Sequence, residues 1–508
     1  MNKKGRPQKM TEQQEKSMLL SDLLPSEKLA QDATVKGLAI DSRQVKKDYL
    51  FAAIKGVKVD GYDYIPQALE QGASVILTDK REDEGLDVGS AVLIKDNNPR
   101  KKLAGLAALF SKFQPGCLSA VTGTNGKSSV ASFARAIWQQ LGHSSASVGT
   151  LGVDSDDYKI EGSLTTPDSI SLHQHLSNLS QAGVTHAALE ASSHGLDQFR
   201  VDGCDVKIAA FTNLTRDHMD YHGSEEDYFT AKARLFTEVL RKDGTAVIFL
   251  HEKWGERLVE MMKERGIKTI TVGEDARSEI CLLDIETNGP SQSITIGYRT
   301  KMFDLEIPLA GRFQAWNMAV AAGIVIASGE KPEEVFNCLP KLKAVPGRME
   351  LAGKTPSGGH IYVDYAHTPD GLEHALRSAR GMGSGKLGVV FGCGGDRDKG
   401  KRPQMGEIAA RLADRVYVTD DNPRSENAAT IRSEILAACP GAGDFSSREK
   451  AIEMAVKDLE EGDVLVVSGK GHETGQIVGD KVLPFDDFAA IKMALNALSG
   501  QVSMDLDS

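Results

Sequence analysis

The sequence predicts an α/β protein of several domains, in which parallel sheets carry helices on both faces. Two observations lead to this prediction. Short apolar segments typical of strands alternate with segments whose apolar residues recur at helical spacing. Glycine or polar residues follow most of the apolar segments, and 50 glycines among 508 residues suit a fold with many tight turns. A chain of this length is expected to form about two to four domains.

The first block is predicted to be a small α/β domain over residues 18–114. A helix is expected over residues 64–73 and a strand over 74–79. The apolar period of residues 103–113 predicts a last helix, which ends at a Gln-Pro-Gly break. Residues 1–17 are polar and basic and lack the apolar core of a signal peptide, so we expect a disordered tail there.

Two larger blocks follow, over residues 115–345 and 346–508. In the first, the strand-like segments are 117–123, 186–192, 206–214 and 244–250, with a pair of edge strands over 293–309. In the second they are 360–366, 387–395, 416–423 and 463–471, which indicates a doubly wound sheet. Ligands of such sheets bind beyond the carboxyl ends of the strands, where the chemically rich residues of both blocks lie.

Composition excludes several classes of protein. The net charge of −11 argues against a nucleic-acid scaffold, which would carry a basic face. Six scattered cysteines without a C-x-x-C pair indicate neither a disulfide framework nor a zinc site, and they suit a reducing cytoplasm. No run reaches the ~18 apolar residues that a membrane span needs. We therefore expect a cytoplasmic monomer that acts on small molecules.

The stretch VTGTNGKS, residues 121–128, reads as a phosphate-binding loop that lacks its usual first glycine, because Val121 stands there. The apolar positions that follow, Val130, Phe133, Ala134, Ile137, Trp138 and Leu141, predict a helix that starts at the loop. Such a helix start presents N–H groups to an anion, with Lys127 on the terminal phosphates and Ser128 as a Mg²⁺ ligand. The loop alone leaves ATPases, kinases and ligases open.

Candidate metal ligands follow the loop. Glu190 and His218 come just after apolar strands, where they could reach the same Mg²⁺. His218 and His222 are four residues apart, but the glutamate of H-E-x-x-H and a third ligand are missing, so zinc is not expected. For His194 and His222 a structural role fits at least as well. Lys232, in the segment YFTAKARLF, would by itself be taken for a surface charge.

The loop GTNGKSS resembles that of the Mur ligase family and its folylpolyglutamate synthetase relatives. The resemblance extends to four fragments that follow the loop in this order: LTTPDS, LEASSHGLDQFRV, TNLTRDHMDYHGS and YFTAKARLF. The resemblance covers nearly the whole chain. It implies a UDP-sugar-binding domain over 18–114, a central ATP-binding domain over 115–345 and a Rossmann-like amino-acid-binding domain over 346–508. It also implies that Lys232 is carbamylated to N6-carboxylysine, an anion that partners a second Mg²⁺, so that Ser128, Glu190, His218 and Lys232 hold metal. Lys127, Glu190, His218 and Lys232 would be the catalytic residues.

The resemblance assigns further residues to substrates. The implied ATP-binding set is Gly123, Thr124, Asn125, Gly126, Lys127, Ser128, Ser129, Asn317, Arg348, Asp364 and His367. Asn317 would contact adenine, and Gln314 departs from the family's usual asparagine. The implied set for the UDP-muramoyl dipeptide is Ser42, Thr165, Thr166, Ser192, Gln198 and Arg200, and the loop 56–61 resembles part of the uridine-binding region.

The segment Asp421-Asn422-Pro423-Arg424 reads by default as a polar turn after a strand. In the Mur ligases that add meso-diaminopimelate this segment is DNPR, whereas lysine-adding members lack the arginine. The physics agrees, since diaminopimelate has a second carboxylate that a guanidinium can bind in a bidentate pair. Arg397, Gly469 and Glu473 match the family's other contacts to this amino acid. The resemblance thus implies ATP-dependent amide synthesis on UDP-N-acetylmuramoyl-L-alanyl-D-glutamate through an acyl phosphate.

The residues by themselves leave three alternative functions to consider. A folylpolyglutamate synthetase shares the loop and the lysine but is expected to lack DNPR and the TTP and SSHGL segments. A non-catalytic nucleotide-binding regulator would be expected to lose one of the four catalytic residues. A simple P-loop kinase or ATPase would not need a second, amino-acid pocket.

Overall fold

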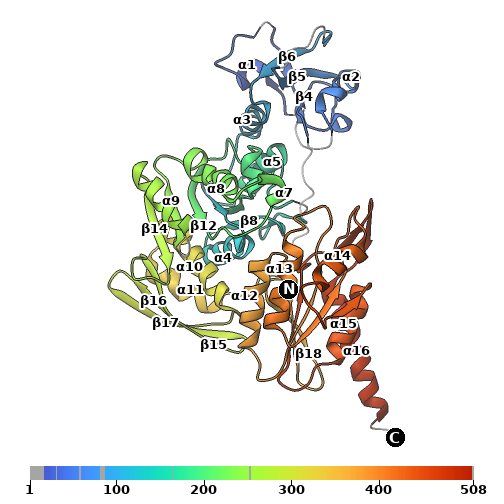
Figure 1. Cartoon of the computed structure of the whole chain (residues 1–508). Coiled ribbons are helices and arrows are strands. Elements are labelled where there is room, and N and C mark those ends of the chain that lie inside the picture. Colours follow the sequence, from blue (N-terminus) through green and yellow to red (C-terminus); the bar gives the residue numbers. More distant parts are fainter. Residues whose placement is uncertain are drawn as a thin grey trace, which may run out of the picture. The chain divides into compact units, whose positions relative to one another are not determined.

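The computed structural model describes residues 16–29, 31–56, 59–80, 86–162, 164–250 and 253–505, with side chains up to residue 500. Most of the predicted tail over 1–17, two positions of the loop 56–61 and Ser163 lie outside these ranges. The chain forms two compact units. The first runs to Pro115 and includes the later segments 167–182 and 195–204, and the second contains the rest (Figure 1).

The first unit is built on a four-stranded parallel sheet of order β3-β4-β5-β6. Its strands are β3 (Gly37–Ala39), β4 (Tyr49–Ala53), β5 (Ala73–Asp79) and β6 (Val92–Asp96). Helices α1 (Leu20–Leu23), α2 (Ile65–Glu70) and α3 (Pro99–Ser111) accompany it, with a short pair of β1 (Met18–Leu19) and β2 (Thr34–Val35). Helix α5 (Ser169–Gln181) packs on α3, where Ser177 Oγ donates to the Ser111 carbonyl at 3.0 Å.

The second unit contains a large sheet whose middle strands are parallel. These are β8 (Ser145–Gly149), β11 (His186–Glu190), β7 (Cys117–Thr122), β12 (Val206–Phe211), β13 (Thr245–Leu250) and β14 (Lys268–Gly273). Their helices are α4 (Lys127–Gln140), α7 (Met219–His222), α8 (Glu225–Arg234), α9 (Lys253–Glu264), α10 (Arg312–Ala327) and α11 (Pro332–Cys338). Helix α6 (Ser193–Asp197) begins in the second unit and ends in the first. The predicted helix after the loop is confirmed as α4, whose apolar face is buried against β11 and α10.

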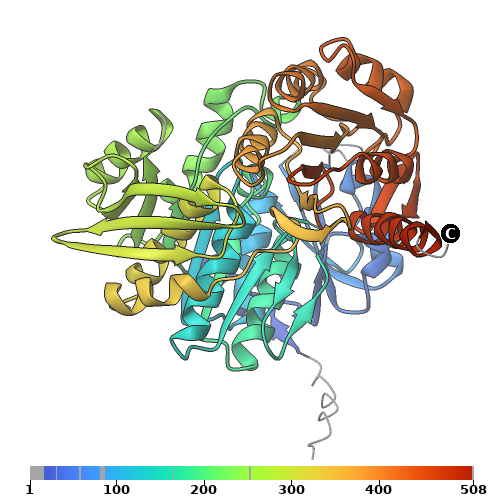
Figure 2. The ribbon, with the colours of Figure 1, turned by 90° about the horizontal axis from the view of Figure 1, so that it is seen from below.

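Further strands with antiparallel pairing extend this sheet at both edges, although β15 joins β14 in parallel. At one edge lie β9 (Gly152–Asp154) and β10 (Lys159–Ile160). At the other, β15 (Ile280–Asn288), β16 (Ser291–Tyr298) and β17 (Lys301–Ile307) project as a long ribbon (Figure 2). The prediction of paired strands over 293–309 is therefore confirmed.

A second sheet of order β18-β19-β23-β20-β21-β22 is parallel except for β18. Its strands are β18 (Glu350–Lys354), β19 (His360–Asp364), β20 (Leu387–Phe391), β21 (Arg415–Thr419), β22 (Gly443–Phe445) and β23 (Val464–Ser468). One face packs on α12 (Pro369–Arg380), α13 (Lys401–Leu412) and α14 (Ala428–Leu436), and the other on α15 (Arg448–Lys457) and α16 (Asp487–Asp505). Helices on both faces confirm the doubly wound prediction.

A hairpin of β24 (Gly475–Val478) and β25 (Lys481–Pro484) stands beside this second sheet. Its apolar residues Val478, Val482 and Leu483 are exposed. Among the described residues, no helix is long and apolar enough to cross a membrane.

Candidate active site

The phosphate-binding loop connects β7 to α4, as predicted, and its glycines are required by close contacts. Gly126 has φ +87°, and a Cβ there would lie 2.2 Å from Asn317 Oδ1. A Cβ on Gly123 would lie 1.8 Å from Thr212 Oγ1. Asn213 holds the loop from β12's end by accepting from the backbone N–H groups of Thr124 and Asn125, each at 2.9 Å. Only a loop with glycine at both positions fits this space.

Two lysines converge on this loop. Lys127 Nζ donates to the carbonyls of Gly123 and Thr124 at 2.9 and 2.8 Å, and Lys232 Nζ donates to the same Gly123 carbonyl at 2.8 Å. Lys232 is 1 % exposed, so it is not the surface charge that its helix position alone would indicate. Burial, and then the charge of Lys127, lower the pKa of Lys232 well below its usual value.

Ser128 and Glu190 form the buried polar centre of the site. Ser128 Oγ donates to Glu190 Oε2 at 2.9 Å and accepts from Arg348 Nη2 at 3.2 Å. The Glu190 carboxylate also accepts from the N–H and hydroxyl of Thr150, at 2.9 and 3.2 Å. Oxygen atoms of a carboxylate and a hydroxyl side by side are the donor set that Mg²⁺ prefers.

His218 lies at the start of α7 with φ +55°, a left-handed conformation that few residues other than glycine adopt. Its imidazole Nε2 is 3.3 Å from Asp217 Oδ2, and its backbone N–H donates to Asp217 Oδ1 at 2.8 Å. Burial lowers the pKa of His218 to about 3 against the opposing charge of Asp217. A neutral imidazole at physiological pH is the form that binds a metal ion.

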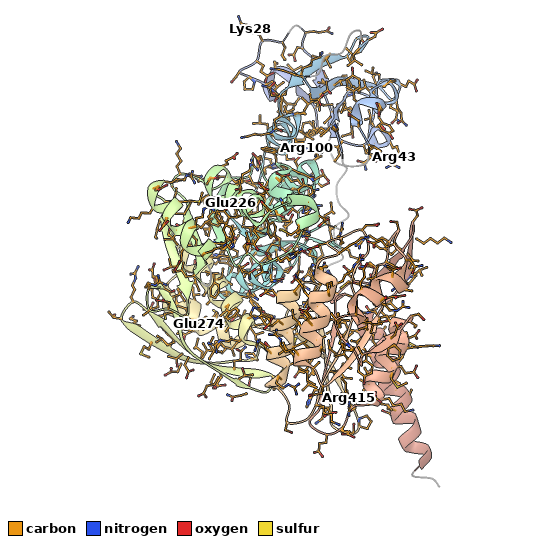
Figure 3. The ribbon with its side chains drawn as sticks, viewed as in Figure 1. Lys28, Arg43, Arg100, Glu226, Glu274 and Arg415 are labelled. Atoms are coloured by element: carbon orange, nitrogen blue, oxygen red, sulfur yellow. The ribbon has the colours of Figure 1, made fainter. Side chains whose placement is uncertain are left out.

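A cavity of ≈ 220 Å³ opens beside these residues. Aromatic side chains form one wall, and Trp316 is oriented by a hydrogen bond from its Nε1 to Glu274 Oε1 at 2.6 Å (Glu274 is labelled in Figure 3). Of the residues assigned to ATP, the cavity is lined by Thr124, Asn125, Gly126, Lys127, Ser128, Ser129, Asn317, Arg348, Asp364 and His367. Aromatic side chains next to an anion-binding loop are suited to a nucleotide base and its phosphates.

Gln314 is buried next to the cavity-lining Asn317, and its contacts suit the longer side chain. Its Oε1 accepts from Asn317 Nδ2 at 3.1 Å, and its Nε2 donates to the Arg348 carbonyl at 3.3 Å. Both Gln314 and Asn317 are buried. The longer side chain therefore links the predicted adenine contact to the backbone of Arg348.

The residues assigned to the UDP-muramoyl dipeptide are divided between the two units. In the second unit Thr165 and Ser192 line the cavity, and Thr166 Oγ1 donates to the Glu190 carbonyl at 2.8 Å. In the first unit, Arg200 Nη2 donates to Gln198 Oε1 at 2.8 Å, and the buried Ser42 donates to Gln67 Oε1 at 2.7 Å. Within each unit the assigned side chains are hydrogen-bonded in place.

The DNPR turn, Asp421 to Arg424, follows β21 and lies near the loops after β20 and β23. Arg424 is half-buried with φ +52°, and its Nη1 donates to the Gly395 carbonyl at 2.9 Å. A Cβ on Gly394 would lie 2.8 Å from that Nη1. Burial, and then the charge of Arg397, lower the pKa of Arg424. Two guanidinium groups held near each other are suited to bind a carboxylate.

Glu473 and Gly469 complete this group on the loop after β23. Glu473 Oε2 accepts from Asn422 Nδ2 at 3.1 Å, and Gly469, at φ +115°, lies beside Asp421, where a Cβ would be 3.6 Å from Asp421 Oδ2. The pKa of Glu473 is raised by burial and by Asp421. The structure therefore brings the predicted amino-acid residues together at the carboxyl ends of three strands.

Sequence reasoning missed several buried or half-buried charged groups at these sites. Lys470 lies in the segment SGKGHE, residues 468–473, but in the sequence nothing distinguishes it apart from its glycine neighbours. Asp370 accepts from Asn125 of the phosphate-binding loop at 2.9 Å across 245 residues. The fully buried Arg402 pairs with Glu426 and Glu434 beneath the DNPR turn. Their partners are far apart in sequence, so no local pattern indicates them.

Comparison with known proteins decides the family. The model of the Mur ligase middle domain matches residues 121–325, that of the Mur ligase glutamate ligase domain matches 347–471, and that of the Mur ligase family catalytic domain matches 34–110. A protein of Agrobacterium fabrum, named UDP-N-acetylmuramoyl-L-alanyl-D-glutamate--2,6-diaminopimelate ligase, is 47 % identical over 96 % of each chain. The chain belongs to the Mur ligase family. It is therefore an ATP-dependent ligase with the three-domain architecture of that family, as predicted.

Other relatives agree with this membership. A protein of the same name from Mesorhizobium japonicum is 48 % identical, over 94 % of this chain and 98 % of that one. A solved structure with this name has a TM-score of 0.68 at 30 % identity and covers 95 % of this chain and 99 % of that one. A Mycobacterium tuberculosis folylpolyglutamate synthase has a TM-score of 0.60 at 19 % identity over 73 % of this chain and 91 % of its own, which is a likeness of fold alone.

Proposed function

We propose that this Mur ligase joins meso-2,6-diaminopimelate to UDP-N-acetylmuramoyl-L-alanyl-D-glutamate, in the cytoplasm and as a monomer, during peptidoglycan synthesis. The observation that carries the choice of amino acid is the half-buried Arg424, held beside Arg397 at the end of β21. A guanidinium there binds the second carboxylate that distinguishes diaminopimelate from lysine. The named relatives add support, because their names state this reaction.

The reaction would proceed in two steps at the loop and its cavity. The terminal carboxylate of the dipeptide attacks the γ-phosphorus of ATP, ADP leaves, and an acyl phosphate forms. The free amine of diaminopimelate then attacks the acyl carbon, and the tetrahedral intermediate expels inorganic phosphate and a proton to give the amide. Lys127 and Arg348, which both reach the loop region, stabilise the negative charge that develops.

Mg²⁺ fits the buried oxygens of Ser128 and Glu190, with the neutral His218 as a further ligand. When bound, it would neutralise phosphate charge and polarise the transferred phosphoryl group. We also propose that Lys232 carries a carbamate. Its lowered pKa increases the share of neutral amine, the form that attacks CO₂ and then loses a proton, and the carbamate anion formed would suit a second Mg²⁺. The assigned domain bounds 18–114, 115–345 and 346–508 are part of the same proposal.

The test is phosphate release with ATP, Mg²⁺ and the UDP-muramoyl dipeptide, with either diaminopimelate or lysine as the amine. We expect release with diaminopimelate and a kcat/KM for lysine that is lower by up to about 10⁴-fold. Equal rates with both amines would contradict the assignment of Arg424. Light scattering of the purified protein tests the monomer.

A further inference from the structure

Lys470 lies at the centre of the three loops that form the amino-acid pocket. It follows β23 between Gly469 and Gly471, and its side chain is fully buried. Its Nζ donates to Asn422 Oδ1 at 3.1 Å and to the Gly475 carbonyl at 2.7 Å. One ammonium group therefore ties the DNPR turn to the start of the hairpin β24–β25.

The same ammonium lies between two carboxylates. Asp421 Oδ1 is 3.5 Å and Glu473 Oε2 is 3.6 Å from Lys470 Nζ. Asp421 Oδ1 is buried and has no hydrogen-bond partner among the described residues. The pKa of Glu473 is raised by burial and by Asp421, while Lys470 opposes this shift. Without Lys470, the buried Asp421 and the half-buried Glu473 would lie close together with no positive charge between them.

Lys470 and the backbone of Ile477 together orient the Asn422 amide. The Asn422 Oδ1 accepts from Lys470 and from the Ile477 N–H at 2.9 Å, so its Nδ2 is left to donate to Glu473. The hairpin in turn holds Arg424, whose N–H donates to the Ile477 carbonyl at 3.1 Å and whose carbonyl accepts from Gly479 at 2.8 Å. Gln476 Nε2 closes this network by donating to the Asp421 carbonyl at 2.6 Å.

We propose that Lys470 is a positioning residue for amino-acid recognition, acting through Asn422, Glu473 and the hairpin β24–β25 to hold Arg424 and the two carboxylates around the incoming zwitterion. This inference rests on the proposed function. It assigns no chemical step to Lys470, which is not among the residues that line the nucleotide cavity in the described part of the chain. Its effect should therefore fall on one substrate of the three.

The test is steady-state kinetics of Lys470→Met with each substrate varied in turn. We expect the KM for diaminopimelate to rise at least about tenfold, because hydrogen bonds to a charged group are lost within the pocket. The KM values for ATP and the UDP-muramoyl dipeptide should stay within about twofold. The matched control is Lys481→Met, an exposed lysine of the same hairpin, which should leave all three values unchanged.

The outcomes are distinct. An unchanged KM for diaminopimelate in folded Lys470→Met, or an equal rise for all three substrates, overturns the inference. If thermal unfolding shows that Lys470→Met does not fold, Gln476→Ala tests the same network through a half-buried residue. An unchanged KM for diaminopimelate in Gln476→Ala then overturns the inference. If the wild-type protein does not use diaminopimelate at all, the proposed function fails instead.

Discussion

The two proposed ligand regions of the second unit hold their lysines in different ways. At the phosphate-binding loop, Lys127 and Lys232 donate to backbone carbonyls and share the oxygen of Gly123. In the amino-acid pocket, Lys470 lies between Asp421 and Glu473 and is hydrogen-bonded to Asn422. In the first region the two lysines are hydrogen-bonded to backbone oxygens, whereas in the second two carboxylates flank the lysine before any substrate arrives. We therefore expect the first region to depend mainly on the charge of the group that binds there, and the second to depend mainly on its own network of hydrogen bonds and ion pairs.

The largest effect is expected from Lys232→Ala, which removes the group that would become an anion in the first region. We expect kcat to fall about 10³-fold, because the carbamate and the metal it partners are lost together. Phosphate release measures the loss. Intact-protein mass spectrometry should show a mass increase of one CO₂ on the wild-type protein under bicarbonate and none on the variant.

Rescue sharpens this prediction. Short-chain carboxylic acids should restore part of the activity of Lys232→Ala by occupying the carbamate's place. Lys263→Met, an exposed lysine on α9, is the matched control and should keep full activity. Full activity in Lys232→Ala would remove Lys232 from the mechanism.

In the second region the strongest expected effect comes from Arg424→Ala. The variant keeps the network around Lys470 but loses the guanidinium, so kcat/KM for diaminopimelate should fall about 10²-fold. Activity with lysine should change little, and the ratio of the two kcat/KM values should collapse. Arg377→Ala, on the exposed face of α12, serves as the control. If the ratio of kcat/KM for diaminopimelate to kcat/KM for lysine is unchanged in Arg424→Ala, another group binds the second carboxylate.

How much of this the sequence predicts depends on the range of the interactions. The loop, α4 and the strand ends are predictable because each rests on spacing within about twenty residues. The burial of Lys232 is not predictable, because its partner Gly123 lies 109 residues away. The segment YFTAKARLF by itself is typical of a surface helix. The position of Lys470 in the network is not predictable for the same reason, because its partners Asp421 and Asn422 follow a different strand. The assignment of 167–182 and 195–204 to the first unit likewise depends on packing that no local pattern encodes.

The smallest expected effect concerns the stability of the second region and comes from Glu426→Gln. The hydrogen bond from the buried Arg402 lowers the pKa of Glu426 to about 2. A carboxyl whose folded pKa is depressed stabilises the fold above its ordinary pKa of about 4.5, and this contribution is lost as the pH falls toward 2.

Glu426→Gln should therefore be less stable than the wild type at pH 7, by about 1–2 kcal/mol, since Arg402 keeps its second partner Glu434. That corresponds to a fall of about 2–8 °C in the midpoint of thermal unfolding of a domain of this size. The difference should shrink steadily between pH 5 and pH 3. A difference that is the same at both pH values would mean that packing, not the charge on Glu426, accounts for it, and that the amino-acid pocket is not held by balanced charges at this point.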